Sequence, residues 1–233
     1  MVMAIRGLLK YLFEKAGYHV SSKQFMSDAD YLKQLVNANR ENEVVIFDVG
    51  ANVGNYTSRM LEIASRASVY CFEPFESSFN QLSNRFASQA LVKPARLALA
   101  DFIGEKNFYV NSAFSETNSL LKPASLEQAS VVQVACTTID AVAKSYNLNT
   151  IHVLKIDVQG AELAVLKGAT AMLSSKKIDL IRVEVIFDRL YDEQSFFGET
   201  LKYLNAHGYK FSGFIEPVYN NNIMLWSDAI FVK

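Results

Sequence analysis

Residues 47–57 read FDVGANVGNYT, and they continue an apolar run that begins at Val44. The chain holds only ten glycines, and two of them, Gly50 and Gly54, lie in this stretch. A strand, a glycine-containing turn and a helix place the backbone N–H groups of the helix start against a ligand that lies across the strand ends. The stretch therefore predicts a site for a nucleotide-containing cofactor.

The spacing of these glycines argues against two common nucleotide-binding motifs. A nicotinamide fingerprint places glycines at relative positions 0, 2 and 5, whereas here Asn52 and Asn55 stand at the second and third of these positions. No Gly-Lys-Ser/Thr follows, as a phosphate-binding P-loop requires. The stretch instead resembles the Asp-x-Gly-x-Gly-x-Gly loop of class I S-adenosylmethionine (SAM) methyltransferases, with Asp48 first and Asn52 in place of the middle glycine.

From residue 44 onward, short apolar runs alternate with longer amphipathic ones, which indicates a parallel α/β sheet covered by helices on both faces. A further helix is expected near Asp28–Val36. A β-hairpin is expected between the third and fourth strands, and two antiparallel strands are expected at the end of the chain. The expected strands are Val44–Val49, Ser68–Phe72, Ala95–Ala100, Ile151–Ile156 and Asp179–Val185, with the hairpin formed by Lys106–Val110 and Val131–Cys136.

The composition indicates one globular domain at residues 44–233, preceded by a helical extension at residues 1–43. The 233 residues are half apolar, which is enough for a substantial core. Because 23 basic residues nearly balance 24 acidic ones, nucleic acid is not an expected partner. Cys71 and Cys136 lie in apolar runs, where buried reduced thiols are the ordinary expectation for a cytoplasmic protein.

The first twenty residues predict an amphipathic helix, because apolar side chains recur at helical spacing between charged ones. The stretch is too short and too charged to span a membrane. We expect this helix to cover the core or to contact a second subunit. The alternative is a peripheral anchor at the inner membrane surface.

Three later segments strengthen the resemblance. Glu73 ends the second strand, 25 residues after Asp48, where a carboxylate can accept both ribose hydroxyls of an adenosine. Residues 155–169 read KIDVQGAELAVLKGA, and residues 228–232 read DAIFV. Taken in order from about residue 44 to the end, these motifs closely resemble the FkbM family of SAM-dependent methyltransferases.

The resemblance implies a three-layer, Rossmann-like class I fold with a mostly parallel sheet and an antiparallel C-terminal strand. It implies SAM as the cofactor and, in most members, O-methylation of sugars, glycolipids or secondary metabolites. Gln159 departs from the family pattern, which commonly has glutamate at this position. The first 43 residues lie outside the shared motifs.

The glycine loop carries four of the expected cofactor contacts. Under the resemblance, Gly50 and Gly54 admit the methionyl part of SAM to the backbone, and Asn52 donates to its carboxylate; the alternative is a tight turn without a ligand. Asp48 either holds the methionine ammonium or fixes the loop by accepting backbone hydrogen bonds.

The remaining expected cofactor contacts follow the loop. Tyr56 and Thr57 open the next helix and are placed to touch SAM, although Tyr56 equally suits a packing role. Glu73, followed by Pro74, is expected to bind the ribose. The adenine is expected beside Ala100 and Asp101, at the end of the third strand.

Three carboxylates are candidates for removing a proton from an acceptor hydroxyl. Asp157 ends the fourth strand, where it serves as the general base or anchors the SAM ammonium. Glu162 lies in the first turn of the next helix, where it orients the acceptor or favours the helix dipole. Glu184 ends the fifth strand in apolar surroundings that require a partner, for which Arg182 and Lys155 are candidates.

The expected protein is a SAM-dependent O-methyltransferase that acts on a hydroxyl-bearing glycan or small metabolite. The alternatives are N- or carboxyl-methylation, or a SAM-binding protein without catalytic activity. The polar segment Ser112–Ser119 is expected to form part of a substrate lid, with a loop of no function as the alternative. No spacing of histidine, cysteine and aspartate is typical of metal ligands, so no metal is expected.

Overall fold

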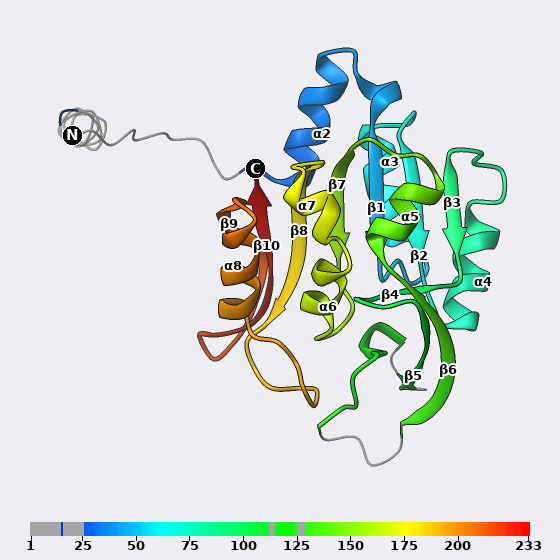
Figure 1. The fold of residues 1–233 in the computed structure, drawn as a ribbon, viewed down its shortest axis with the longest axis vertical. Helices are drawn as coiled ribbons and strands as arrows, with labels where there is room; N and C mark the ends of the chain where they lie inside the picture. Colours follow the sequence, from blue (N-terminus) through cyan, green and yellow to red (C-terminus); the bar gives the residue numbers. More distant parts are fainter. Residues whose placement is uncertain (1–14, 16–25, 112–114, 125–128) are drawn as a thin grey trace.

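The computed structural model describes residues 15, 26–111, 115–124 and 129–233. Its centre is a seven-stranded sheet with the order β3-β2-β1-β7-β8-β10-β9 (Figure 1). The strands from β3 to β8 run parallel, and β10 runs antiparallel to both β8 and β9, as expected. The strands of this sheet are β1 Val45–Val49, β2 Ser68–Phe72, β3 Val92–Ala95, β7 Ile151–Ile156, β8 Ile178–Ile186, β9 Lys210–Asn220 and β10 Ile223–Val232.

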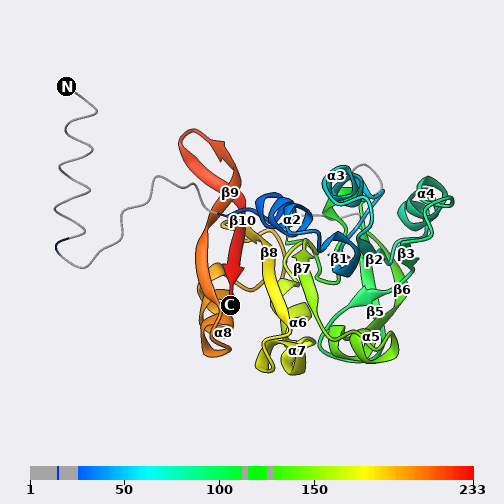
Figure 2. The ribbon, with the colours of Figure 1, turned by 90° about the horizontal axis from the view of Figure 1, so that it is seen from above.

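Helices cover both faces of this sheet (Figure 2). One face is covered by α2 Asp28–Asn37, α3 Asn55–Ile63 and α4 Glu76–Arg85. The opposite face is covered by α5 Ile139–Ser145, α6 Glu162–Lys167, α7 Thr170–Ser174 and α8 Phe197–Ala206. The expected three-layer arrangement is therefore confirmed.

Successive residues of the central strands enter two separate cores. On β1, Ile46 packs in the core that contains Leu32 of α2 and Met60 of α3, whereas Phe47 packs in the core on the other face. Because side chains alternate between the two faces of a strand, a sheet covered on both sides requires apolar residues at every position. This requirement explains the uninterrupted apolar runs of the sequence.

A second, three-stranded sheet lies beside the first and has the order β4-β6-β5. It contains the expected hairpin as β5 Gly104–Val110 paired antiparallel with β6 Ser130–Thr137, and it adds β4 Ala98–Leu99.

The expectation of a single strand at Ala95–Ala100 is wrong. The third strand of the main sheet, β3, ends at Ala95, where the N–H of Leu97 donates to the Ala95 carbonyl in a turn. Residues 98 and 99 then pair parallel with β6 in the second sheet. The apolar run at residues 95–99 therefore contributes residues to both sheets.

The helix expected near Asp28–Val36 is confirmed as α2, which begins with a capping box between Ser27 and Asp30. Tyr31 on this helix donates a hydrogen bond of 2.6 Å to Asp179 on β8. The described part of the extension therefore packs directly against the sheet.

The helix predicted for the first twenty residues lies outside the described residues, apart from Lys15, which is helical. Among the residues that the structure describes, no helix has the length and apolar character needed to cross a membrane. The two cysteines are free and buried, as expected.

Candidate active site

A cavity of about 350 Å³ opens at the carboxyl ends of the parallel strands. Val49 of β1, Phe72 of β2 and Glu184 of β8 contribute to its wall. In parallel α/β sheets this edge is where ligands bind. A second cavity adjoins the first, and the residues that line both are Gly50, Asn52, Glu116 and Asp157.

The backbone conformation and the close packing of the first loop require glycine at two positions. Gly50 has a φ of +73°, and a side chain on it would overlap the carbonyl oxygen of Asp157. Gly54 has a φ of +84° and faces Leu82 and Phe86 of the α4 region. Gly50 lines both cavities, so it remains available to a cofactor, whereas Gly54 lines neither.

Asp48 and Thr57 lie beneath the loop and outside both cavities. Asp48 is fully buried and accepts a hydrogen bond of 2.7 Å from the Thr57 hydroxyl. Its second oxygen lies 3.2 Å from Nζ of Lys155. Asp48 is therefore held by side-chain partners beneath the loop and lines neither cavity.

Tyr56 lines the second cavity. Its hydroxyl donates to Asp28 at 2.7 Å, and its ring lies within 5.7 Å of the charged groups of Arg59, Lys155 and Arg182. Burial, reinforced by the Asp28 carboxylate, raises its pKa well above the ordinary value. The ring thus packs among the three cations.

Glu73 and Asn52 meet at the wall of the main cavity. The two carboxylate oxygens of Glu73 each accept one backbone N–H, from Asn52 and from Phe75, both at 2.9 Å. Burial raises the pKa of Glu73 to about 7. Asn52 has a φ of +46°, and its Oδ1 is buried without a partner in the described part of the chain. Pro74 lines the same cavity.

Ala100 and Asp101 do not line the cavity. Because the chain crosses between sheets at residue 97, the cavity wall is formed instead by residues 97–99. Ala100 is buried, and its N–H donates to Thr137, while Asp101 is exposed. Of this segment, residues 97–99 rather than Ala100 and Asp101 therefore line the cavity.

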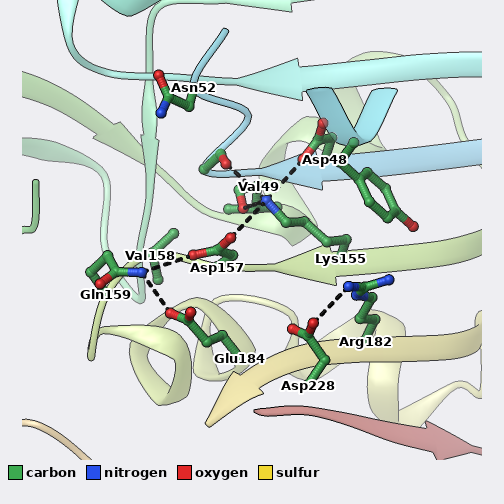
Figure 3. Close-up of polar contacts among 12 residues, drawn as sticks. Asp48, Val49, Asn52, Lys155, Asp157, Val158, Gln159, Arg182, Glu184 and Asp228 are labelled. Carbon is green, nitrogen blue, oxygen red and sulfur yellow. Dashed lines mark hydrogen bonds and ion pairs between the residues drawn. The ribbon is translucent and has the colours of Figure 1, made fainter. Parts of the chain in front are cut away.

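Lys155 is a buried cation that links the carboxyl ends of β1 and β7 (Figure 3). Its Nζ lies 3.2 Å from Asp48 and 3.4 Å from Asp157, and it donates to the Gly50 carbonyl at 2.8 Å. Burial lowers its pKa, but the carboxylates of Asp157 and Asp48 outweigh burial and raise the pKa above the ordinary value. Lys155 is therefore charged and compensates both carboxylates.

Gln159 bridges two carboxylates at the cavity (Figure 3). Its Nε2 donates to Asp157 Oδ1 at 3.1 Å and to Glu184 Oε2 at 2.7 Å. Its Oε1 accepts a hydrogen bond of 3.2 Å from the Tyr191 hydroxyl. Sequence reasoning noted this glutamine as a departure from the family and did not foresee the bridge.

Glu184 has no cation beside it within the described residues, so the expected ion pair with Arg182 or Lys155 is wrong. Arg182 instead pairs with three other carboxylates, those of Asp28, Glu216 and Asp228. Burial raises the pKa of Glu184 well above its ordinary value, and the negative charges of Asp157 and Glu162 raise it further.

Glu162 shapes the loop between β7 and α6. Its Oε1 accepts the N–H groups of Val158 at 3.2 Å and of Gly160 at 2.9 Å, and it lines neither cavity. Burial raises its pKa to about 7. The loop that it holds contains Gln159 with a φ of +56° and Gly160 with a φ of +96°.

Part of the expected lid reaches the cavity. Residues 112–114 lie outside the described residues, whereas residues 115–118 line the cavity. The Ser119 hydroxyl donates to the Gln159 carbonyl at 2.7 Å, and the Tyr191 hydroxyl donates to the Thr117 carbonyl at 2.9 Å. These bonds fix the segment to the loop after β7 and to the segment that follows β8.

Three apolar residues of the cavity were not singled out from the sequence: Ile186, Leu190 and Trp226. Trp226 is the single tryptophan of the chain, which was the one available signal. Within the described residues, no group of three or more histidine, cysteine, aspartate and glutamate side chains is arranged to hold a metal ion.

The strand order and the cavity at the carboxyl ends of β1, β2, β7 and β8 define a class I, Rossmann-like SAM methyltransferase fold. An rRNA methylase from Streptococcus thermophilus has a solved structure with this fold. The two structures align with a TM-score of 0.50 at 12% sequence identity, over 92% of this chain and 99% of that chain.

The pattern of the methyltransferase FkbM domain matches residues 48–211, so the chain belongs to the FkbM methyltransferase family. It is 26% identical to the hexuronic acid methyltransferase AglP of Haloferax volcanii over 168 residues, which are 71% of this chain and 66% of AglP. It is 23% identical to the 2-O-methyltransferase NoeI of Sinorhizobium fredii over 175 residues, which are 70% of this chain and 71% of NoeI. The expected family, the enzyme class and the cofactor SAM are thereby confirmed.

The polar groups of the cavity suit SAM. The unpartnered Oδ1 of Asn52 is a buried acceptor, for which an ammonium group is a suitable donor. Each oxygen of Glu73 holds one N–H and retains a further acceptor site, which two ribose hydroxyls can fill. Asp157, at the junction of the two cavities, adds negative charge near a cationic ligand.

Proposed function

We propose that this chain transfers a methyl group from SAM to a hydroxyl of a sugar, in a glycan, a glycolipid or a glycosylated metabolite. The observation that carries the proposal is that Glu73, Asp157 and Glu184 face one cavity at the carboxyl edge of the sheet. The similarity to a hexuronic acid methyltransferase and to a 2-O-methyltransferase supports a sugar as the acceptor.

In this proposal, the cofactor lies along the β1, β2 and β7 ends. Glu73 binds the ribose hydroxyls, residues 97–99 flank the adenine, and Asn52 and Asp157 hold the ammonium of the methionyl part. Gly50 allows the close approach of the cofactor to the backbone. Asp48, Thr57 and Glu162 support this surface from beneath without touching the cofactor.

When bound, SAM supplies an activated methyl group on a positively charged sulfur. The task of the protein is to align the acceptor oxygen with that methyl group and to accept the hydroxyl proton as the new bond forms. Glu184 is the proton acceptor in this proposal, because it lines the main cavity, burial raises its pKa, and no cation lies beside it among the described residues. Asp157 has Lys155 beside it and instead provides fixed negative charge.

Gln159 acts as a positioning residue. By donating to both carboxylates it holds Glu184 toward the cavity, and Tyr191 in turn holds the glutamine amide. A neutral side chain at this point joins Asp157 and Glu184 without adding a third negative charge. The raised pKa of Glu184 then depends on burial and on the neighbouring carboxylates.

The direct test incubates the purified chain with SAM that carries a ¹³C-labelled methyl group and with a panel of methyl glycosides, both neutral and uronic. We expect mass spectrometry to detect a labelled methyl ether on at least one glycoside. Label on the uronic carboxyl group, or on amine acceptors added as controls, would show a different acceptor chemistry. No transfer to any glycoside, while SAM binds, would contradict the proposal.

A further inference from the structure

The lining of the main cavity includes an apolar group and a polar group besides the proposed base. The apolar group consists of Ile186, Leu190 and Trp226. The polar group consists of residues 115–118 of the hairpin loop. A ligand that fits this part of the cavity has one apolar surface and one surface with hydrogen-bonding groups.

Trp226 lies on the strand that neighbours Glu184. On β10 and β8, Asp228 is in register with Glu184, and Trp226 is in register with Ile186, two residues further along. Two residues of a strand span about 6.6 Å. The indole therefore lies along the cavity wall roughly one sugar ring beyond the level of the Glu184 backbone.

The indole is partly exposed at the cavity. Trp226 is 39% exposed and Leu190 is 45% exposed, although both line the cavity. Tryptophan exposes a flat, electron-rich surface that loses little conformational entropy when a ligand covers it. The C–H groups on one face of a pyranose ring carry slight positive charge and match that surface.

An independent observation within the polar group also points to a ligand. Asn118 is 8% exposed and lines the cavity, and its Nδ2 is buried without a hydrogen-bond partner within the described residues. Its Oδ1 is fixed because it accepts the N–H of Asn111 at 2.8 Å. A buried donor without a partner costs free energy unless a ligand supplies an acceptor.

We propose that Trp226 and Asn118 form the two sides of the acceptor subsite. The apolar face of the acceptor sugar ring packs on the indole of Trp226, and a ring hydroxyl oxygen accepts a hydrogen bond from Asn118 Nδ2. This inference rests on the proposed function and specifies its acceptor as a ring with one apolar face. Ile186 and Leu190 extend the apolar side.

The first test uses Trp226 as its own reporter, because no other tryptophan contributes to the fluorescence. The wild-type chain is saturated with S-adenosylhomocysteine and titrated with the methyl glycoside that accepts label in the direct test. We expect a blue shift of the emission and reduced quenching by acrylamide. An unchanged spectrum at saturating glycoside, with methyl transfer intact, would overturn the inference and leave the proposed function standing.

The second test separates acceptor binding from chemistry. Trp226→Ala is expected to raise the KM for the glycoside roughly tenfold, with the affinity for S-adenosylhomocysteine unchanged, and Trp226→Phe is expected to retain most of the wild-type KM. Ile223→Ala is the matched control, because this residue is on the same strand, is exposed and lines neither cavity. Equal KM values for Trp226→Ala and the control would overturn the inference.

The third test concerns the polar side. Asn118→Asp keeps the shape and the Oδ1 acceptor but replaces the donor, so it is expected to raise the KM for the glycoside. A set of monodeoxy glycosides should contain one for which wild type and Asn118→Asp have the same KM. If Asn118→Asp raises the KM by the same factor for every deoxy analogue, Asn118 does not donate a hydrogen bond to the sugar. If no glycoside binds or is methylated, this inference fails together with the proposed function.

Discussion

The amide nitrogen of Gln159 lies 2.7 Å from Oε2 of Glu184, so a neutral side chain holds the candidate base in place. The same nitrogen lies 3.1 Å from Asp157. The family resemblance of the sequence implies glutamate at this position. Substitutions of Gln159 can therefore separate two effects on Glu184. One is the loss of the hydrogen bond that Gln159 donates, and the other is the addition of a third carboxylate.

Gln159→Glu is expected to lower methyl transfer at pH 7 roughly tenfold. The new carboxylate loses both donated hydrogen bonds and adds negative charge, which raises the pKa of Glu184 further. The acid limb of the kcat/KM profile should therefore move to higher pH. Gln159→Leu, which removes the bridge without adding charge, should lower kcat with a smaller movement of that limb. Identical pH profiles for wild type and Gln159→Glu would contradict the positioning role.

Glu184→Gln is expected to lower kcat by roughly 10²–10⁴-fold, which is the usual contribution of a general base. Affinity for S-adenosylhomocysteine should change little. In the wild type, kcat/KM should fall as the pH decreases through the raised pKa of Glu184, because protonation removes the base. Asp188→Asn is the control, since Asp188 is exposed and lines neither cavity. A Glu184→Gln variant with wild-type kcat would assign the base elsewhere, with Asp157 as the next candidate.

Glu73 should make cofactor binding dependent on pH. Its pKa is raised to about 7, and only the ionised form offers both oxygens to the ribose hydroxyls. Calorimetry should therefore show tighter binding of S-adenosylhomocysteine at pH 8 than at pH 6. Glu73→Gln should weaken binding at least tenfold and remove this pH dependence. Glu76→Gln, which changes an exposed carboxylate three residues further on, should do neither. If Glu73→Gln binds as the wild type does, Glu73 does not hold the ribose.

Glu162 should make the folded state less stable as the pH rises. Its folded pKa is about 7, above an unfolded value of about 4.3, so the folded state binds more protons between these values. The free energy of unfolding should decrease by about 4 kcal/mol from this group as the pH increases from below 4.3 to above 7, and the loss should be complete above pH 7. Urea titrations at several pH values measure this slope.

In Glu162→Gln the slope should become smaller by the contribution of this group, because the amide oxygen still accepts the N–H groups of Val158 and Gly160 but does not ionise, while Glu73 and Glu184 still titrate. Glu62→Gln on the exposed side of α3 should keep the wild-type slope. A wild-type slope in Glu162→Gln would show that its carboxyl does not ionise in this range.

Lys155 compensates two carboxylates, and its removal should destabilise the protein. Lys155→Met leaves the fully buried Asp48 without a cation, which is expected to cost about 3–5 kcal/mol of unfolding free energy. The double variant Lys155→Met with Asp48→Asn should recover a large part of that loss. Additive effects of the two substitutions in chemical denaturation would contradict the coupling.

The sequence predicted the strands of the main sheet well where an apolar run coincides with a single strand. β1, β2 and β7 are buried on both faces, so an apolar run marks each of them directly. The run at Ala95–Ala100 was misassigned because apolar character does not show which of two sheets a residue enters. For the same reason, Ala100 and Asp101 were expected at the cavity, which residues 97–99 line instead.

The individual roles were harder to predict because they depend on turns. Gln159 reaches both carboxylates because its own backbone has a φ of +56°. The spacing of residues in a sequence does not predict this conformation for a glutamine. Asp48 was expected near the cofactor, but Lys155 from a strand more than a hundred residues later pairs with it. Trp226 enters the cavity because β10 inserts between β8 and β9, which is a property of the topology.

The most direct measurement is a crystal structure of the chain with S-adenosylhomocysteine and the methyl glycoside that it methylates. We predict both ribose hydroxyls within hydrogen-bond distance of Glu73, and the accepting hydroxyl between the cofactor sulfur and Glu184. A ribose bound away from Glu73, or an acceptor hydroxyl that no carboxylate of the cavity can reach, would contradict this account.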